Sequence, residues 1–172
     1  MDSPSAIFLD YSARELRRAS GRIQDCLRRL TDEQIWSRGA ETENAVGNLV
    51  LHLSGNVRQW IVSGVGGEPD QRDRDAEFAA RAGLGAQALT GHLRDVVNAA
   101  TAVIEKLPHE RLTHRFTVQN YNVTVLEAIY HVVEHFSGHT GQIIFATKLL
   151  TGEDLGYYRH LRIAAPHAEQ TP

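Results

Sequence analysis

Four long stretches of the sequence carry apolar residues at the three- and four-residue spacing of an amphipathic helix. They cover about residues 5–30, 44–64, 86–107 and 124–150. In the first stretch the apolar side chains recur among many charged ones: Ile7, Tyr11, Leu16, Ile23 and Leu27. Long helices that each have one apolar face bury it by packing together. The pattern therefore predicts an all-α protein built as a four-helix bundle.

Local signals place several boundaries of these helices. The segments Thr31–Gln34 and Thr124–Glu127 both match a capping box, in which two side chains satisfy the free N–H groups of a helix start. The first box predicts a short additional helix, and the second predicts the beginning of the last long helix. Pro108 and Gly152 follow the third and fourth long stretches, where a proline or glycine commonly ends a helix.

Between the helices, two connections differ in character. The stretch RFTVQNYNVTV has β-branched and aromatic residues around a Gln-Asn-Tyr-Asn turn, which predicts a small β-hairpin before the last helix. The stretch RDRDAEFAARAGLG reads as a charged connection, long enough to cross one end of the bundle. We expect a single domain over residues 1–165 and a disordered tail over residues 166–172.

Composition narrows the class of protein. The 172 residues are 42% hydrophobic and 23% charged, with a formal net charge of −3, which favours a globular domain and gives no electrostatic reason to bind nucleic acid. The single cysteine excludes an intrachain disulfide. The start, MDSPSAIFLDYSARELRR, lacks the pattern of a signal peptide, and no segment is apolar enough to span a membrane. We expect a soluble cytoplasmic protein.

The last helical stretch contains HVVEHFSGHTGQ, with histidines at 131, 135 and 139. A step of four residues turns a helix by only about 40° from one side chain to the next, so His131, His135 and His139 share one face. Gln142 falls within the same stripe, and Glu127 lies at its edge. Three stacked imidazoles of this kind are unusual. Their spacing alone is compatible with metal binding and equally with histidines that pack in the core or lie at the surface.

The second helical stretch repeats the spacing of this polar stripe. Asn48, His52, Asn56 and Gln59 follow one another at the same intervals, on a helix whose other positions are mostly apolar. A polar stripe on an apolar helix faces either water or a satisfied interior site. Two matching stripes predict that the two helices face each other across a polar cleft. Gly55, beside His52, would let another group come close.

Two histidines four apart can bind one metal ion, and a third ligand must come from elsewhere in the chain. His52 is the best donor, because it lies in the middle of another long helix. Spacing alone leaves the pair open between His131 with His135 and His135 with His139. Three protein nitrogens leave a coordination position free, which is typical of catalytic sites, and they suit several divalent metals.

A mid-helix histidine followed by a C-terminal H-x-x-x-H-x-x-x-H and Gly-Gln resembles the DinB/YfiT-like metalloenzyme superfamily. The stretches NLVLHLSGNVRQWI, RDRDAEF and TVLEAIYHVVEHFSGHTGQI are similar to a branch catalogued as a domain of unknown function, over roughly residues 5–160. The resemblance implies a DinB-like four-helix bundle, often a homodimer, with a divalent metal, zinc or nickel, held at one end by His52, His135 and His139.

The resemblance also bears on activity. Superfamily members with known activity include S-transferases and isomerases that use small thiols, so it implies a small-thiol cosubstrate and an electrophile as partners. Hydrolysis by a metal-activated water is the other enzymatic interpretation. A non-catalytic metal- or ligand-binding bundle is the competing class.

Other residues near the stripes have two interpretations each. We expect His131 to support the site, hydrogen-bonded to Glu127 or simply packed. Asn48, Asn56, Gln59 and Gln142 could contact substrate, or form hydrogen bonds between helices.

The charged stretch could cover the cleft, with Arg72 or Arg74 meeting an anionic substrate, although solvated salt bridges account for most of its charges. HVVEH also matches the inverzincin pattern, which would make Glu134 a general base. Many relatives have an arginine before the Gly-Gln, where this chain has Thr140.

Overall fold

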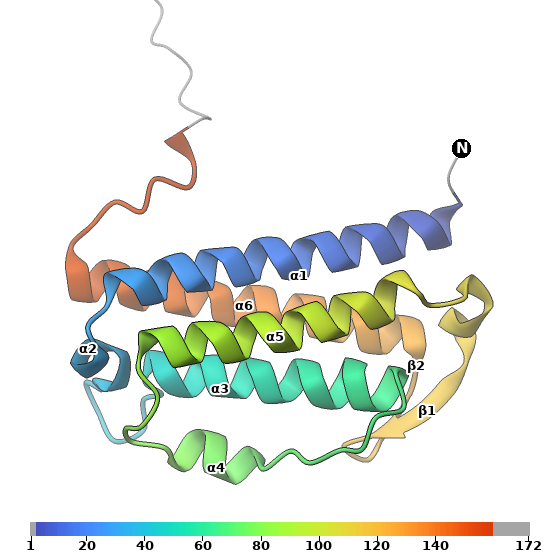
Figure 1. Ribbon diagram of the computed structural model, residues 1–172, viewed down its shortest axis with the longest axis horizontal. Coiled ribbons are helices and arrows are strands. Elements are labelled where there is room, and N and C mark those ends of the chain that lie inside the picture. The colour runs from blue at the N-terminus through green and yellow to red at the C-terminus, as the bar shows by residue number, and fades with distance from the viewer. Residues whose placement is uncertain (1–2, 160–172) are drawn as a thin grey trace, which may run out of the picture.

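A computed structural model describes residues 3–159 (Figure 1). Its elements in chain order are α1 (Pro4–Arg29), α2 (Asp32–Trp36), α3 (Val46–Val57), the π-helix η1 (Arg58–Val65), α4 (Arg74–Ala79), α5 (Ala86–Glu105), the 3₁₀ helix η2 (His109–Thr113), β1 (Arg115–Val118), β2 (Tyr121–Thr124) and α6 (Val125–Thr151).

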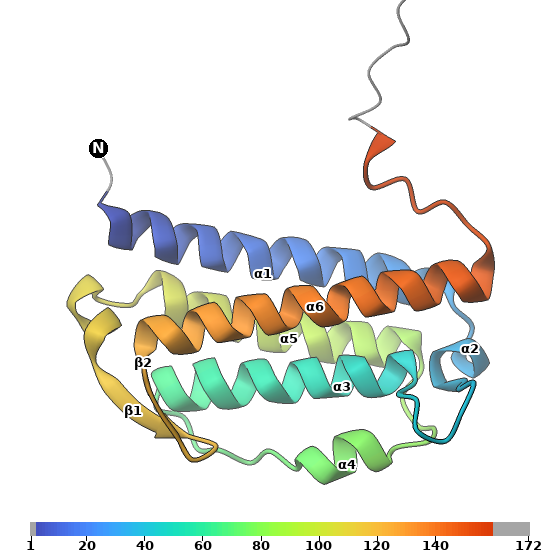
Figure 2. The same cartoon turned by 180° about the vertical axis from the view of Figure 1, so that it is seen from behind.

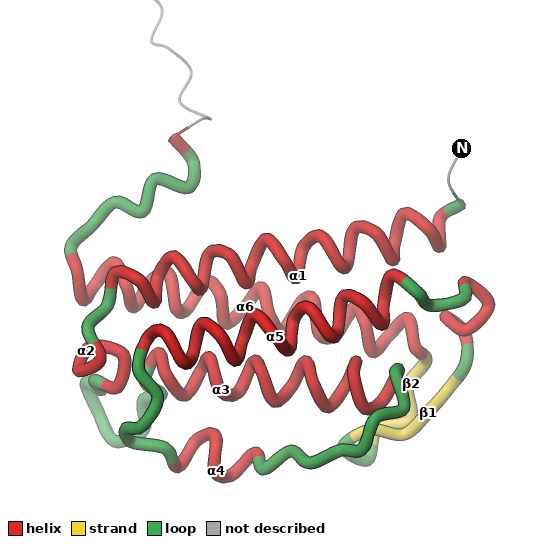
Figure 3. Tube along the Cα trace, viewed as in Figure 1, coloured by secondary structure: helices red, strands yellow, loops and turns green. Residues whose placement is uncertain are grey.

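Four long rods lie alongside one another: α1, α3 continued by η1, α5 and α6 (Figures 1 and 2). Helix α1 packs on α5 and α6, and α3 packs on the same two helices. Their apolar faces meet in one core, whose largest fully buried side chains include Leu16, Ile23, Leu53, Leu93, Ile104, Ile129 and Phe136. The predicted all-α four-helix bundle is confirmed, and the hairpin lies at one end of it (Figure 3).

Both predicted capping boxes form. The Thr31 hydroxyl accepts from the backbone N–H of Gln34, and the Thr124 hydroxyl accepts from that of Glu127. Each cap of this kind stabilises a helix start by about 1 kcal/mol. Gly152 adopts the left-handed conformation, with φ 70°, directly after α6. The sequence signals therefore located the start of α2 and both ends of α6.

Two local elements were not predicted. The charged connection contains α4, capped by Asp73, whose carboxylate accepts from the backbone N–H of Ala76 at 2.9 Å. A six-residue helix is too short for its periodicity to be read, so the sequence predicted a charged connection without the helix that lies in it. In addition, the second long helix changes to π geometry after Val57, which widens its last turns where it approaches the hairpin.

The predicted hairpin is confirmed, with a tighter turn. Val118 pairs with Tyr121, so the loop consists of Gln119 and Asn120 alone. Both have positive φ, 49° and 66°, as a type I′ turn requires. Tyr121, which we assigned to the turn, begins β2.

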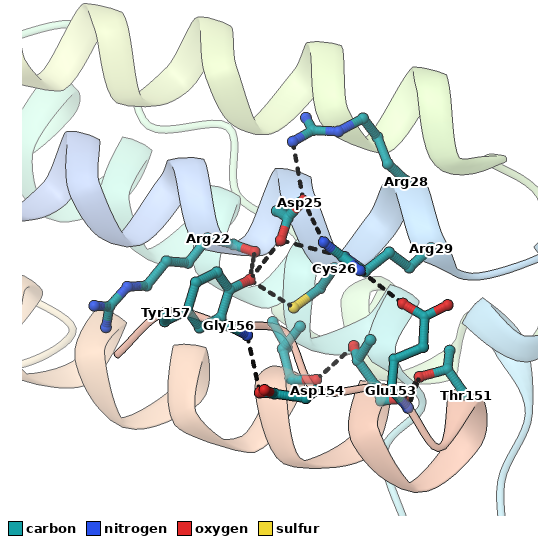
Figure 4. Close-up of polar contacts among 12 residues, drawn as sticks. Arg22, Asp25, Cys26, Arg28, Arg29, Thr151, Glu153, Asp154, Gly156 and Tyr157 are labelled. Carbon is teal, nitrogen blue, oxygen red and sulfur yellow. Dashed lines mark hydrogen bonds and ion pairs between the residues drawn. The ribbon is translucent and has the colours of Figure 1, made fainter. Parts of the chain in front are cut away.

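After α6 the chain folds back and is anchored on α1 by Tyr157 (Figure 4). Its hydroxyl lies 3.0 Å from Asp25 Oδ2, 3.2 Å from the carbonyl oxygen of Arg22 and 3.7 Å from the buried Cys26 Sγ. Cys26 is therefore a packing residue beneath this anchor. The predicted tail, residues 166–172, lies outside the described residues. No helix among residues 3–159 is long and apolar enough to cross a membrane.

Candidate metal centre

Three histidines converge where α3 faces α6. His52 comes from α3, and His135 and His139 come from successive turns of α6. One ring nitrogen of each lies within 4.8 Å of those of the other two. The Nε2 atoms of His52 and His135 are 2.9 Å apart. Of the two histidine pairs left open by the spacing, the structure brings His135 and His139 together with His52.

His52 is fixed from behind by the short helix α4. Its Nδ1 lies 3.2 Å from Glu77 Oε2, which can only accept, and 3.1 Å from Arg72 Nη2, which can only donate. Arg72 donates to both oxygens of Glu77, from Nε at 2.7 Å and from Nη2 at 2.8 Å. The ion pair is buried, with side chains 3% and 10% exposed. This arrangement leaves His52 Nε2 as the atom that faces the cluster.

The charge on Glu77 is itself stabilised. Burial raises the pKa of this carboxyl, but hydrogen bonds and opposite charge from Arg72 and His52 outweigh burial and lower the pKa below its ordinary value. Glu77 is therefore ionised at neutral pH. A carboxylate so firmly paired is a poor general base, and its role is to orient His52.

His139 is oriented in the same manner by a residue on its own helix. Its Nδ1 donates to Gln142 Oε1 at 2.7 Å. Gln142 therefore belongs to the site, through its contact with His139. Two of the three histidines thus have Nδ1 paired to an oxygen acceptor, which is the usual support of metal-binding imidazoles.

Burial and mutual repulsion keep the α6 histidines of the cluster neutral. Burial, with smaller contributions from His139, His52, His131 and Arg72, lowers the pKa of His135 to about 4. Burial also lowers the pKa of His139. Neutral imidazoles have the free lone pair that a metal ion needs, and three histidines in one place suit a divalent metal ion.

A cavity of about 560 Å³ opens beside the cluster. His52, His135 and Asn56 line one part of it, and Trp60 and the hairpin residue Tyr121 line another. A volume of this size is typical of small-molecule sites. The π geometry of η1 and the hairpin therefore build the wall of a chamber next to the histidines.

His131 lies in this cavity wall, outside the cluster. Its ring packs against Trp60, with centroids 4.3 Å apart, and burial lowers its pKa. Of the two alternatives for His131, a hydrogen bond to Glu127 or packing alone, the structure shows packing. The Glu127 carboxylate instead accepts from the backbone N–H and hydroxyl of Thr124, at 2.6 and 2.8 Å, and thereby completes the capping box.

Asn48 and Gln59 form hydrogen bonds between elements. This was one of the two interpretations that the sequence allowed, and contact with substrate was the other. Asn48 is fully buried, and its amide donates to the carbonyl oxygen of Glu77 at 2.8 Å, which ties α4 to α3. Gln59 accepts from Arg72 at 2.9 Å and from Gln119 at 2.6 Å. Both side chains hold the surroundings of the site in place.

Asn56 differs from its neighbours on the stripe. It lines the cavity and is 3% exposed, and its Oδ1 has no hydrogen-bond partner within residues 3–159. A buried acceptor without a partner costs about 1–3 kcal/mol.

Other charged residues that the sequence singled out fall in different places. Arg72 is an exception to the solvated charges expected in its segment, because it is buried against Glu77. Arg74 lies over the ring of Phe78, at 4.9 Å, and lines the cavity. Glu134 lines a separate groove between α1 and α6, which does not support the inverzincin alternative, in which it would be the general base.

Thr140 lies on that same groove between α1 and α6. Its hydroxyl donates to the carbonyl oxygen of Phe136 at 2.7 Å. The position at which this chain differs from many relatives therefore faces away from the cavity beside the histidines.

Glu77 is the residue of the site that sequence reasoning missed, together with its pairing to Arg72, which the sequence singled out only as a contact for an anionic substrate. Gly55 was the available signal, since it marks a close approach to the helix next to His52. A Cβ on Gly55 would lie 1.8 Å from Glu77 Oε1. Nothing in the sequence, however, identified which of several acidic residues approaches there.

The family model described as "Protein of unknown function (DUF1572)" matches residues 3–165. No curated protein matches the chain. A conserved protein from Enterococcus faecalis is similar in structure, with a TM-score of 0.69 at 18% identity, over 84% of this chain and 97% of that one. A DinB-like protein, YjoA, from Bacillus subtilis has a TM-score of 0.66 at 15% identity, over 86% and 97%. At these identities the likeness concerns the fold.

Proposed function

The chain belongs to this family of unknown function, and we propose that it is a metal-dependent enzyme in which His52, His135 and His139 hold a divalent ion, zinc or nickel. The convergence of three ring nitrogens within 4.8 Å carries the proposal. The oxygen atoms of Glu77 and Gln142 next to Nδ1 of His52 and His139 support it, because metal-binding imidazoles usually have such a partner on the other ring nitrogen.

Three histidine ligands leave room for a further ligand, and the cavity begins at His52 and His135. An ion bound there would lower the pKa of a water or thiol that reaches it from the cavity. The chain's own residues do the rest. Glu77 orients His52, burial keeps His135 neutral, and Trp60 forms part of the wall that a substrate would contact.

The substrates would be a small thiol and an electrophile, or water and a hydrolysable compound. Transfer of a thiol ranks first because the superfamily resemblance implies it, whereas the cavity is compatible with both. A non-catalytic metal- or ligand-binding bundle is the alternative, and the resemblance also supports a homodimer. The experiments below separate the catalytic proposal from the first of these.

The metal site is tested by metal content. We expect about one ion per chain in the purified protein by plasma mass spectrometry, and its loss in His52→Ala and in His135→Ala. His131→Ala is the matched control, because this histidine is on the same helix stripe but outside the cluster, and it should retain the ion. Unchanged metal in both cluster variants would show that the triad is wrong.

Activity is tested separately. Thiol consumption is measured with a panel of electrophiles, and hydrolysis with a panel of esters and amides. We expect turnover by the metal-loaded protein that His135→Ala lacks. A stoichiometric metal with no turnover above that variant in either panel would favour the non-catalytic alternative.

A further inference from the structure

Helices α1 and α6 leave an apolar surface of the bundle uncovered. In Figure 2, α6 runs across the front of the molecule, and no other described element lies over it. Large exposed apolar patches are rare on soluble monomers and mark interaction sites. Ten large apolar side chains among residues 3–159 are exposed, and eight of them belong to α1, α6 or the segment just after α6: Ile7, Tyr11, Leu126, Tyr130, Phe145, Leu149, Leu150 and Tyr158.

Along α6 this surface has large apolar residues toward both ends and glycines in the middle. Tyr130 is 64% exposed, Phe145 65% and Leu149 71%. Gly138 and Gly141 lie between them, and a Cβ on either would meet nothing within 4 Å. Packing within one chain therefore gives no reason for glycine there, although each costs a helix about 0.5–1 kcal/mol relative to alanine. We call these five residues the outer stripe of α6.

A groove of about 700 Å³ lies beside the outer stripe, between α1 and α6. Tyr11 of α1 and Tyr130 of α6 line it, together with Gly138 and Gly141. A helix that rested on the two glycines would therefore contact α1 as well as α6. None of the three clustered histidines lines this groove, so a partner bound there leaves the metal centre accessible.

Two charges beside the outer stripe indicate what the partner is. Glu134 follows Tyr130 by four residues and Lys148 follows Gly141 by seven, so both charges lie on this side of the helix. Neither forms an ion pair within residues 3–159. They are about 21 Å apart along the axis, too far to pair within one helix. If a second α6 lay antiparallel across the glycines, Glu134 of each copy would come within about one turn of Lys148 of the other.

The surface is large enough for a stable dimer. From Tyr130 to Leu149, α6 extends about 28 Å, and α1 alongside it makes the surface about 20 Å wide. Two copies would then bury roughly 1,100 Å² together, just above the area of about 1,000 Å² that a specific interface needs.

We propose that this surface binds a second copy of the chain, with the two α6 helices antiparallel about a two-fold axis near Gly138 and Gly141. A two-fold interface uses the same patch twice, so the patch must complement itself. The outer stripe meets this condition, because reversing one copy places apolar end on apolar end, glycine on glycine, and acid near base. The inference goes beyond the proposed function and does not depend on a bound ion.

The mass of the purified full-length protein in solution tests the dimer, by sedimentation equilibrium over a range of concentrations. We expect two chains per particle. Phe145→Glu should raise the dissociation constant at least roughly tenfold, because it buries a charge against an apolar partner. Leu84→Glu is the matched control, since this exposed residue lies outside α1 and α6, and it should have no effect. A monomeric wild type, or equal effects of the two variants, would overturn the proposal and leave the surface to a different partner.

Charge reversal tests the antiparallel arrangement. Glu134→Lys places like charges near each other twice per dimer, and so does Lys148→Glu, so each should weaken the dimer roughly tenfold. The double variant restores opposite charges and should return the dissociation constant to near the wild-type value. Both side chains are exposed, so equal helix content by circular dichroism is expected in all of these variants. A double variant no tighter than the single ones would contradict the arrangement.

Disulfide formation tests the position of the axis. A residue near a two-fold axis lies beside its own copy, so Gly141→Cys should form an intermolecular disulfide under mild oxidation. Gly91→Cys on α5 is the control, because a Cβ there also meets nothing within 4 Å, and it should stay reduced. The natural Cys26 is fully buried and should not react. A disulfide in both variants, or in neither, would be inconsistent with an axis at the glycines.

Discussion

At the scale of single residues, Gly55 and the carboxylate of Glu77 share a space that one methyl group would fill. A Cβ on Gly55 would also lie 2.9 Å from Arg72 Nε, so it meets both partners of the buried ion pair. The carboxylate is the flexible end of its side chain, but Arg72 holds it from two sides. The absence of a side chain at residue 55 is therefore what allows His52 to have its acceptor.

Gly55→Ala should destabilise the protein although alanine favours helices. Disrupting a buried ion pair costs about 3–5 kcal/mol, and the helix gains about 1 kcal/mol, so we expect a net loss of about 2–4 kcal/mol in chemical denaturation. The affinity for zinc should also fall, because His52 loses its oriented partner. Gly91→Ala on α5 is the matched control: its Cβ meets nothing within 4 Å, and it should be neutral or stabilising. Equal behaviour of the two variants would contradict the role assigned to Gly55.

At the scale of elements, the hairpin joins the site through its turn. Gln119, at φ 49°, is in the left-handed region, and its side chain contacts both Trp60 and Gln59. The turn therefore fixes the wall of the cavity as well as the register of β1 and β2.

Asn120→Gly should stabilise the hairpin. Asn120 has φ 66°, and glycine adopts that conformation at lower cost, so we expect a gain of up to about 1 kcal/mol. Asn122→Gly, two residues later within β2, should instead cost about 0.5–1 kcal/mol, because glycine weakens a strand. Thermal unfolding of the two variants measures this contrast, and the same sign for both would be inconsistent with the two-residue turn.

How far the elements could be predicted depended on how local their signals were. Capping boxes located α2 and the start of α6, because all of their hydrogen bonds fall within four residues. Helix α4 was missed because six residues give no readable period. The change to π geometry in η1 was missed because apolar residues continue along that helix unchanged.

The same distinction applies to the site. His52, His135 and His139 could be predicted because two polar stripes on apolar helices imply a shared face, and the resemblance selected among the pairs. Glu77 could not be predicted, since its contact with His52 spans 25 residues and comes from a segment in which charges are usually solvated. The cavity was beyond prediction, because it depends on how the hairpin lies against η1.

At the scale of the whole molecule, the buried histidines link stability to pH. Burial lowers the pKa of His131, His135 and His139 in the folded state below that in the unfolded chain. The unfolded chain therefore binds more protons below about pH 6.5, and stability falls as the pH is lowered. His135 continues to contribute down to its folded pKa of about 4.

We expect the chelator-treated protein to lose melting temperature steadily from pH 6.5 to about pH 4.5, above the range in which most carboxylates titrate. His135→Ala, measured in the same way, should show a shallower slope. A melting temperature independent of pH over this range would contradict the neutral, buried state of the three histidines.

We expect helix α4 to open more often than the rest of the bundle, because Glu77 is its one buried residue. It packs on α3 at the margin of the bundle, yet it provides the partner of His52 (Figure 1). Elements with so little buried area open locally far more often than a core unfolds. Exchange of a bound ion with solution would then follow the opening of this one segment. The dissociation rate of the metal should therefore match the rate of deuterium exchange of the α4 amides. Both rates should be independent of denaturant at concentrations too low to unfold the bundle.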